Sequence, residues 1–192
     1  MNRSKSFLLL SLLSLAPSIA HGHPGHGTSG FEAGFIHPLF GLDHVLAMVA
    51  VGLWAAQLGG RAVWVVPTSF IATMVAGGAL GIAQVPLPLV EHGILASVVV
   101  LGILIAFAAR VPLVASAALV GLFALFHGHA HGAEMPDTAA GLSYGLGFVL
   151  ATTALHASGV ATALSIRRAA HSEWVRYVGA AITFAGTLLC FR

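Results

Sequence analysis

Charged residues are scarce in this sequence. Asp, Glu, Lys and Arg make up only 7% of the 192 residues, whereas 58% are hydrophobic, and the mean hydropathy is +0.95. Soluble domains contain about 25% charged residues, so the composition excludes an ordinary soluble domain and predicts a membrane protein. The net charge is only +2, and there is no basic patch with interleaved aromatic residues. Nucleic acid is therefore not an expected partner.

Cysteine and lysine are also nearly absent. Cys190 is the single cysteine, which excludes an intrachain disulfide, a zinc site built from cysteines and an iron–sulfur cluster. Lys5 is the single lysine and lies near the N-terminus, so the chain has no P-loop for ATP hydrolysis. The His-Glu-x-x-His motif of zinc metalloproteases is missing as well. We therefore expect no enzymatic activity.

Residues 1–22 have the features of a secretory signal peptide. Arg3 and Lys5 precede an apolar stretch that is too short to span a bilayer, and small residues follow it. Cleavage after Ala20 and cleavage after Gly22 both fit the preference for small residues at the cleavage site. An uncleaved membrane anchor is the alternative.

Residues 23–37 are predicted to lie outside the cytoplasm, because this segment opens with a run of Gly and His that cannot pack a core. If cleavage follows Ala20, the mature chain begins His-Gly-His. Its free amine, two backbone amides and the His23 imidazole then form a planar set of nitrogens that suits Ni(II) or Cu(II). His23 and His26 are thus secondary metal candidates, and a flexible leader that binds no metal is the alternative.

Six apolar segments follow within residues 38–192, each close to the roughly 20 residues that cross a bilayer as a helix. They cover residues 38–58, 62–83, 88–109, 112 to about 131, 138–163 and 174–191. The sequence therefore predicts an all-α fold, a polytopic bundle of six transmembrane helices after a cleaved signal peptide.

The arginines predict the orientation of this bundle. With an exported N-terminus, the loops after the first, third and fifth spans face the cytoplasm, and these hold Arg61, Arg110, Arg167, Arg168 and Arg176. The external loops contain no Lys or Arg, as the positive-inside rule requires. We expect the bacterial cytoplasmic (inner) membrane, with the mature N-terminus on the extracytoplasmic side.

A first polar motif opens the first predicted span and reads His37-Pro38-x-x-Gly41-x-Asp43-His44. Pro38 suits the first turn of a helix. On a continuous helix from Pro38, Asp43 would lie inside the apolar layer, where a carboxylate needs a compensating partner. His37, His44 and Met48 would share one face of that helix, and Asp43 would point about a quarter-turn away from His44.

A second polar motif ends the fourth span and reads Phe126-His127-Gly128-His129-Ala130-His131-Gly132-Ala133-Glu134. On a continuing helix, His127 and His131 share a face and Glu134 follows about one turn later. In an extended stretch, all three histidines would share a face instead. Two imidazoles and a carboxylate can hold a divalent metal ion. A polar helix end wetted by solvent is the alternative.

Other polar residues are weaker candidates. Glu91 and His92, at the external start of the third span, either join the metal site or, for Glu91, favour the positive end of a helix. His156 lies deep in the fifth span, where it either relays an ion inward or bonds to Thr152 or another neighbour. Met48 is a further candidate, although isolated Met in an apolar helix is more often core filler.

Together the two motifs resemble the HupE/UreJ family, the hydrogenase- and urease-associated nickel permeases, over essentially the whole mature chain. The resemblance implies a secondary transporter that imports Ni(II), or another divalent ion such as Co(II), through the lipid bilayer, with no permanently bound cofactor. It also implies a functional link to hydrogenase or urease maturation. The site residues that it implies are His37, Asp43, His44, His127, His131 and Glu134. His129 occupies a variable position of the second motif, so its metal role rests on its chemistry alone.

Two other classes of function fit the same residues. A metal-binding accessory or sensor protein would bind the ion without transporting it. A zinc-dependent membrane enzyme would keep a fixed metal that activates water.

Overall fold

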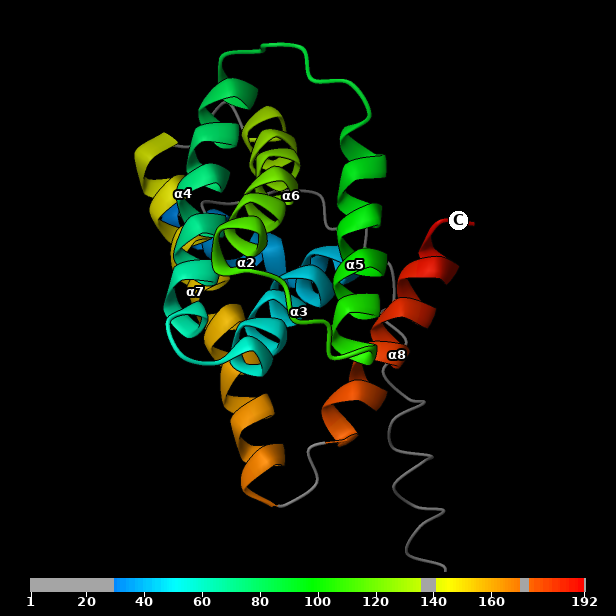
Figure 1. Ribbon diagram of the computed structural model, residues 1–192. Helices are drawn as coiled ribbons and strands as arrows, with labels where there is room; N and C mark the ends of the chain where they lie inside the picture. Colours follow the sequence, from blue (N-terminus) through cyan, green and yellow to red (C-terminus); the bar gives the residue numbers. More distant parts are fainter. Residues whose placement is uncertain (1–29, 136–140, 170–172, 192) are drawn as a thin grey trace, which may run out of the picture.

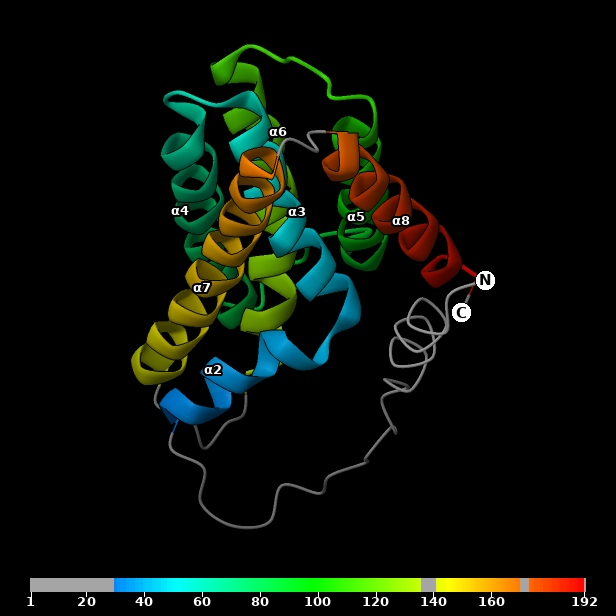
Figure 2. The ribbon, with the colours of Figure 1, turned by 90° about the horizontal axis from the view of Figure 1, so that it is seen from below.

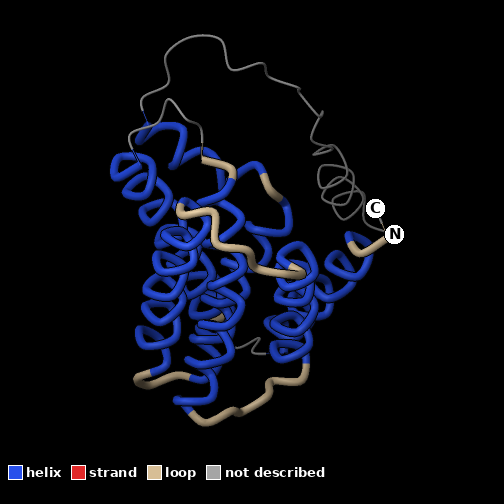
Figure 3. The backbone as a smooth tube through the Cα atoms, turned by 90° about the horizontal axis from the view of Figure 1, so that it is seen from above, coloured by secondary structure: helices blue, strands red, loops and turns tan. Residues whose placement is uncertain are grey.

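The computed structural model describes residues 30–135, 141–169 and 173–191, which form helices and connecting loops without any strand (Figures 1 and 3). The helices are α2 (Gly30–Phe40), α3 (Leu42–Leu58), α4 (Ala62–Ile82), α5 (Val90–Ala106), α6 (Leu113–Ala133), α7 (Gly141–Arg168) and α8 (Glu173–Leu189). The predicted all-α class is confirmed. The predicted signal peptide, His23 and His26 lie outside the described residues.

Helix α3 occupies the centre of the bundle. Between Ala47 and Ala56 every residue except Val49 is buried, because this stretch is apolar on all faces and such a helix is stable only when it is surrounded. It contacts α7 and α4 on one side and α5 and α8 on the other (Figure 2). A polar group that faces this stretch of α3 is therefore enclosed within the bundle.

Helices α4 and α6 pack along one another at very short range. A Cβ at Gly128 of α6 would collide with the Met74 carbonyl of α4, and one at Gly132 would collide with the Gly78 carbonyl. Glycine at these positions lets two helix backbones approach closely in a membrane. This contact fixes the histidine-bearing end of α6 against a rigid neighbour.

Helices α4, α6 and α7 are each long and apolar enough to cross a membrane, and the bent pair α2 and α3 would make a fourth such span. Helix α5 is apolar but shorter. The chain is therefore a multi-pass membrane protein, whereas six spans remain a prediction.

The predicted start of the first span at Pro38 was wrong. Helix α2 begins at Gly30 and contains Pro38, and the chain breaks at Gly41 (φ −83°, ψ 111°), where α2 and α3 meet at 84°. Proline has no N–H to bond the carbonyl one turn earlier, which weakens the helix just before the break. The expected single face with His37, His44 and Met48 is therefore not formed.

Helix α7 is longer than the predicted span and extends to Arg168. Gly141, Ser143 and Gly145, near its start, have the spacing of the nucleophile elbow of serine hydrolases. That elbow requires a sharp turn from a strand into a helix, and here the residues lie within a helix. The pattern does not form that motif.

Candidate metal centre

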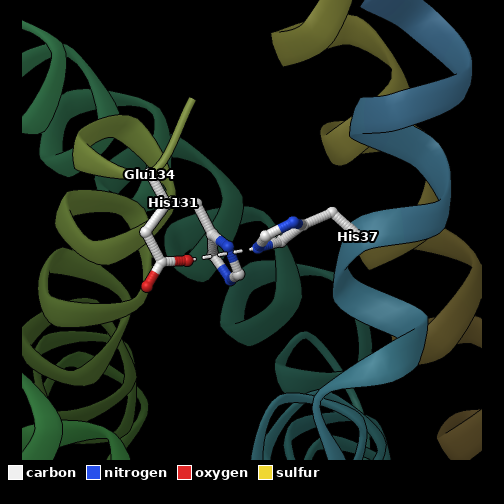
Figure 4. Close-up of side chains that lie close together, drawn as sticks. All are labelled: His37, His131 and Glu134. Atoms are coloured by element: carbon white, nitrogen blue, oxygen red, sulfur yellow. Dashed lines mark ion pairs between the residues drawn. The ribbon is translucent and has the colours of Figure 1, made fainter. Parts of the chain in front are cut away.

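Three candidate ligands from the two motifs converge at one end of the bundle. His37 of α2, His131 of α6 and Glu134, just after α6, each offer a ligand atom, and these atoms lie within 4.8 Å of one another. His37 Nε2 lies 3.3 Å from Glu134 Oε2, and the His37 and His131 rings are 4.7 Å apart, nearly perpendicular. Figure 4 shows the three side chains facing a common point. We call them the outer cluster.

The bend at Gly41 creates the outer cluster. Because α2 turns away from α3 at this point and packs along α7, His37 lies next to the end of α6 rather than in line with α3. The motif residues on either side of Gly41 therefore approach the same space from different directions. A sequence pattern for one straight helix could not show this.

The carboxylate of the outer cluster is ionised near neutral pH. Its hydrogen bond with His37 holds the pKa of Glu134 below the usual range for a glutamate. The side chains of His37 and Glu134 are 36% and 57% exposed, so both are accessible from outside the bundle. An anionic oxygen next to an imidazole is an attractive first contact for a divalent cation.

The outer cluster lines a cavity of about 650 Å³, which Asp43, His44 and Glu91 also line. Of the two candidates at the start of α5, Glu91 therefore belongs to this site, whereas His92 is exposed and lies outside the cavity lining. Carboxylate oxygens and imidazole nitrogens together suit Ni, Cu and Zn ions.

Asp43 has the compensating partner that its position in an apolar run requires. Its Oδ1 accepts one hydrogen bond from His44 Nδ1 at 2.7 Å and another from the His44 backbone N–H at 2.8 Å. Asp43 and His44 follow one another in the first turn of α3, about a quarter-turn apart around the helix, and their side chains still meet. A Cβ at Gly41 would lie 2.8 Å from His44 Nδ1, so glycine leaves room for the pair.

This pairing sets the tautomer of His44. A ring nitrogen that bonds to a carboxylate carries the proton, which leaves the other nitrogen with a free lone pair. His44 Nε2 is that nitrogen, and it is buried without a hydrogen-bond partner among the described residues. His44 is therefore prepared to bind a metal through Nε2.

Ser97 of α5 likewise sets the tautomer of His127. It pairs with Nε2 of that ring, whereas Asp43 pairs with Nδ1 of His44. Ser97 Oγ lies 2.6 Å from the Ile94 carbonyl oxygen, too close unless the hydroxyl proton lies between them. The hydroxyl has one proton, so Ser97 can only accept from His127 Nε2, 3.0 Å away. His127 Nδ1 thus keeps its lone pair, and it has no other partner in the described part of the chain.

The imidazoles form a continuous series from the cavity into the bundle. The His131 ring lies 4.3 Å from the His44 ring, which lies 4.9 Å from the His127 ring. His127 and His131 share a face because α6 stays helical, so the helical alternative for the second motif is confirmed. Both nitrogens of His131 are also buried without a partner among the residues described. Buried polar atoms normally have partners, so these nitrogens are suited to binding a ligand.

Three other candidates lie apart from the outer cluster. His129 is partly exposed, and its Nε2 donates to the Val85 carbonyl at 2.7 Å. Met48 is fully buried in the hydrophobic core. His156 is buried in α7, beyond His127.

Two residues near the site were not identified from the sequence. Ser97 was not singled out because a lone serine in an apolar helix has no pattern that reveals its partner. Tyr144 of α7 lies 6.2 Å from His37, ring to ring, and its buried hydroxyl has no partner within the described ranges. It lies in the first turns of a long helix that begins at Gly141, where no local pattern distinguishes a site residue from a packing residue.

Known proteins match the chain over nearly its whole length. A family model described as HupE / UreJ protein matches residues 10–189, which include every helix described above. The chain belongs to the HupE/UreJ family. Protein HupE from Rhizobium leguminosarum bv. viciae is 47% identical to it over 190 residues, which are 98% of each chain. No solved structure matches the chain. Membership of the HupE/UreJ family links it to hydrogenase and urease accessory function.

Proposed function

We propose that the chain is a secondary permease that imports Ni(II), or a related ion such as Co(II), across the bacterial cytoplasmic membrane. The observation that carries the proposal is the convergence of His37, His131 and Glu134 on one cavity, from which an imidazole series leads inward. Affinity alone would favour Cu(II) over Ni(II) at such ligands. The choice of nickel is supported by the link of the family to hydrogenase and urease.

The half-exposed side chains of Glu134 and His37 meet the hydrated ion first. Glu91 and Asp43 line the same cavity and add negative charge that draws in a cation. The buried imidazole of His131 then replaces water in the coordination shell. Capture and partial dehydration of the ion thus take place at the outer cluster.

The inward step is a sequence of ligand exchanges. His131 contacts His44, and His44 contacts His127, so each new nitrogen binds before the previous one leaves. A bare cation within the apolar layer would be strongly unfavourable. The fixed tautomers of His44 and His127 keep their lone pairs available throughout.

The arginines at the opposite end of the bundle support the proposed orientation. Arg167 donates to the Ala56 carbonyl at the end of α3, and Arg176 donates to the Ala106 carbonyl at the end of α5. By the positive-inside rule this end faces the cytoplasm, with six spans and a cleaved leader completing the topology. A membrane potential of about 100 mV then contributes about 4.6 kcal/mol to inward movement of a divalent ion.

Vesicles that contain the purified protein and an internal Ni(II)-sensitive dye test this proposal. We expect the dye to respond to external Ni(II) in wild-type vesicles and not in vesicles with Glu134→Gln. Metal binding without a response from the dye would instead favour an accessory or sensor protein. Stoichiometric metal that stays bound through purification would favour a zinc-dependent enzyme.

We predict that uptake weakens as the external pH falls below about 6, because a free imidazole gains a proton near pH 6.5 and then cannot bind a metal. Glu134 has a lowered pKa, so its carboxylate stays ionised through this range and the loss arises from histidine. Initial rates of Ni(II) uptake between about pH 7 and pH 5 measure the effect. Equal rates over that range would show that no imidazole in contact with the external solution is a primary ligand.

Ser97→Ala is expected to lower uptake by about tenfold, the usual effect of losing a residue that orients a metal ligand. The change removes the acceptor that holds the proton on His127 Nε2, so Nδ1 is protonated part of the time. Ser97→Thr keeps the hydroxyl and should restore most of the rate. If the Ala and Thr variants are equally impaired at matched abundance, the role of Ser97 is packing rather than orientation.

A further inference from the structure

His156 is an unpaired imidazole in the interior of the bundle. Its side chain lies on α7 and is 2% exposed, and neither ring nitrogen has a hydrogen-bond partner among the described residues. Thr152, one turn earlier, donates instead to Met74 Sδ at 3.7 Å, so the expected bond between Thr152 and His156 is absent. A buried polar group without a partner is unfavourable. His156 therefore destabilises the protein when no ligand is bound.

One phenyl ring separates His156 from the imidazole series of the metal centre. The Phe70 ring of α4 lies 5.6 Å from the His127 ring and 5.0 Å from the His156 ring. His127 is the innermost member of the series described above. His156 is thus the next imidazole after His127 in the direction away from the cavity.

His156 lies at a depth in the bundle that fits a binding step for an ion moving inward. His127 lies about 6 Å deeper than His131, because they are one turn apart on α6. A Cβ at Gly52, well inside α3, would collide with the His156 carbonyl, so His156 lies level with the buried middle of the central helix. The imidazoles therefore occur at increasing depth from the outer cluster to the core.

We propose that His156 is an inner coordination site for the transported divalent metal, which it receives from His127. An unpaired nitrogen of His156 is the primary ligand. The Met74 thioether and the Thr152 hydroxyl, which are hydrogen-bonded to each other about one helical turn nearer the cavity, are the neighbouring groups that can also bind the metal. An imidazole with a thioether about one helical turn away suits a borderline transition metal and not Mg²⁺ or Ca²⁺. This inference rests on the proposed transport function.

The variants His156→Leu and His156→Gln test this role in the full-length protein. We expect Ni(II) uptake to fall at least about tenfold in both, since loss of a supporting residue alone has that effect at metal sites. Ni(II) titration of the purified protein should show unchanged affinity at the outer cluster. The thermal unfolding temperature of His156→Leu should equal or exceed that of the wild type, because an apolar side chain replaces an unpaired polar one.

Two further variants separate the possible outcomes. Thr153→Leu, on the exposed face of the same helix, should keep wild-type uptake, whereas Glu134→Gln should lose both uptake and affinity. Wild-type uptake in either His156 variant, with Glu134→Gln impaired, would overturn the inner site and leave the transport function standing. No uptake by wild-type vesicles above that of protein-free vesicles would overturn the transport proposal and the inner site with it.

Discussion

His131→Ala is expected to abolish Ni(II) accumulation. His131 belongs to the outer cluster, and its ring also contacts His44, so it is the imidazole that connects capture to inward transfer. Its removal leaves His37 and Glu134 without a buried third ligand and interrupts the series. We expect a decrease of at least about 100-fold in uptake rate, because loss of a residue that only supports a metal ligand already costs up to about that much.

His129→Ala is the matched control for this prediction. It makes the same substitution two residues earlier on the same helix, where the imidazole bonds to the Val85 carbonyl instead of facing the cavity. Uptake by His129→Ala should stay near the wild-type rate when both variants are equally abundant in the membrane. Similar losses in the two variants would show that the histidines of α6 act collectively and not through the contacts of His131.

Gly128→Ala is expected to destabilise the folded protein by about 3 kcal/mol or more, the upper end of the effects of overpacking. The added methyl group would meet the Met74 carbonyl, which belongs to a helix backbone and cannot rotate away. Helices α4 and α6 would have to separate, which would displace the adjacent His127. Thermal unfolding in detergent and abundance in the membrane measure the loss.

Gly145→Ala provides the comparison for that experiment. A Cβ at Gly145 meets no described atom within 4 Å, and alanine favours a helix over glycine by about 1 kcal/mol. This variant should unfold at the wild-type temperature or slightly above it. If Gly128→Ala is equally stable, the close approach of α4 and α6 does not limit stability.

The fold class and most helix ends were predictable from the sequence, because long apolar runs between Gly, Pro and Arg specify membrane helices locally. The pairing of the two motifs was predictable as well, because His and acidic residues are costly in apolar runs unless they share a ligand. The bend at Gly41 was not predictable, because Pro38 also suits a helix start. Periodicity alone could not decide between these two roles.

Tertiary contacts decide the remaining details of the site. His129 and His131 have similar sequence surroundings, yet one bonds to a loop carbonyl and the other faces the cavity. Ser97 and His127 are far apart in the chain and meet only when α5 packs on α6. The unpaired state of His156 likewise depends on where Thr152 directs its hydroxyl.

Accumulation of radiolabelled Ni(II) at nanomolar concentration, in cells that lack their own nickel importers, tests the central claim most directly. The comparison is between the wild type, Asp43→Asn and His44→Ala at matched membrane abundance. We predict strong accumulation by the wild type and its loss in both variants, because Asp43 fixes the tautomer through which His44 receives the ion. No accumulation by an abundant wild-type protein, or accumulation that both variants retain, would contradict the claim.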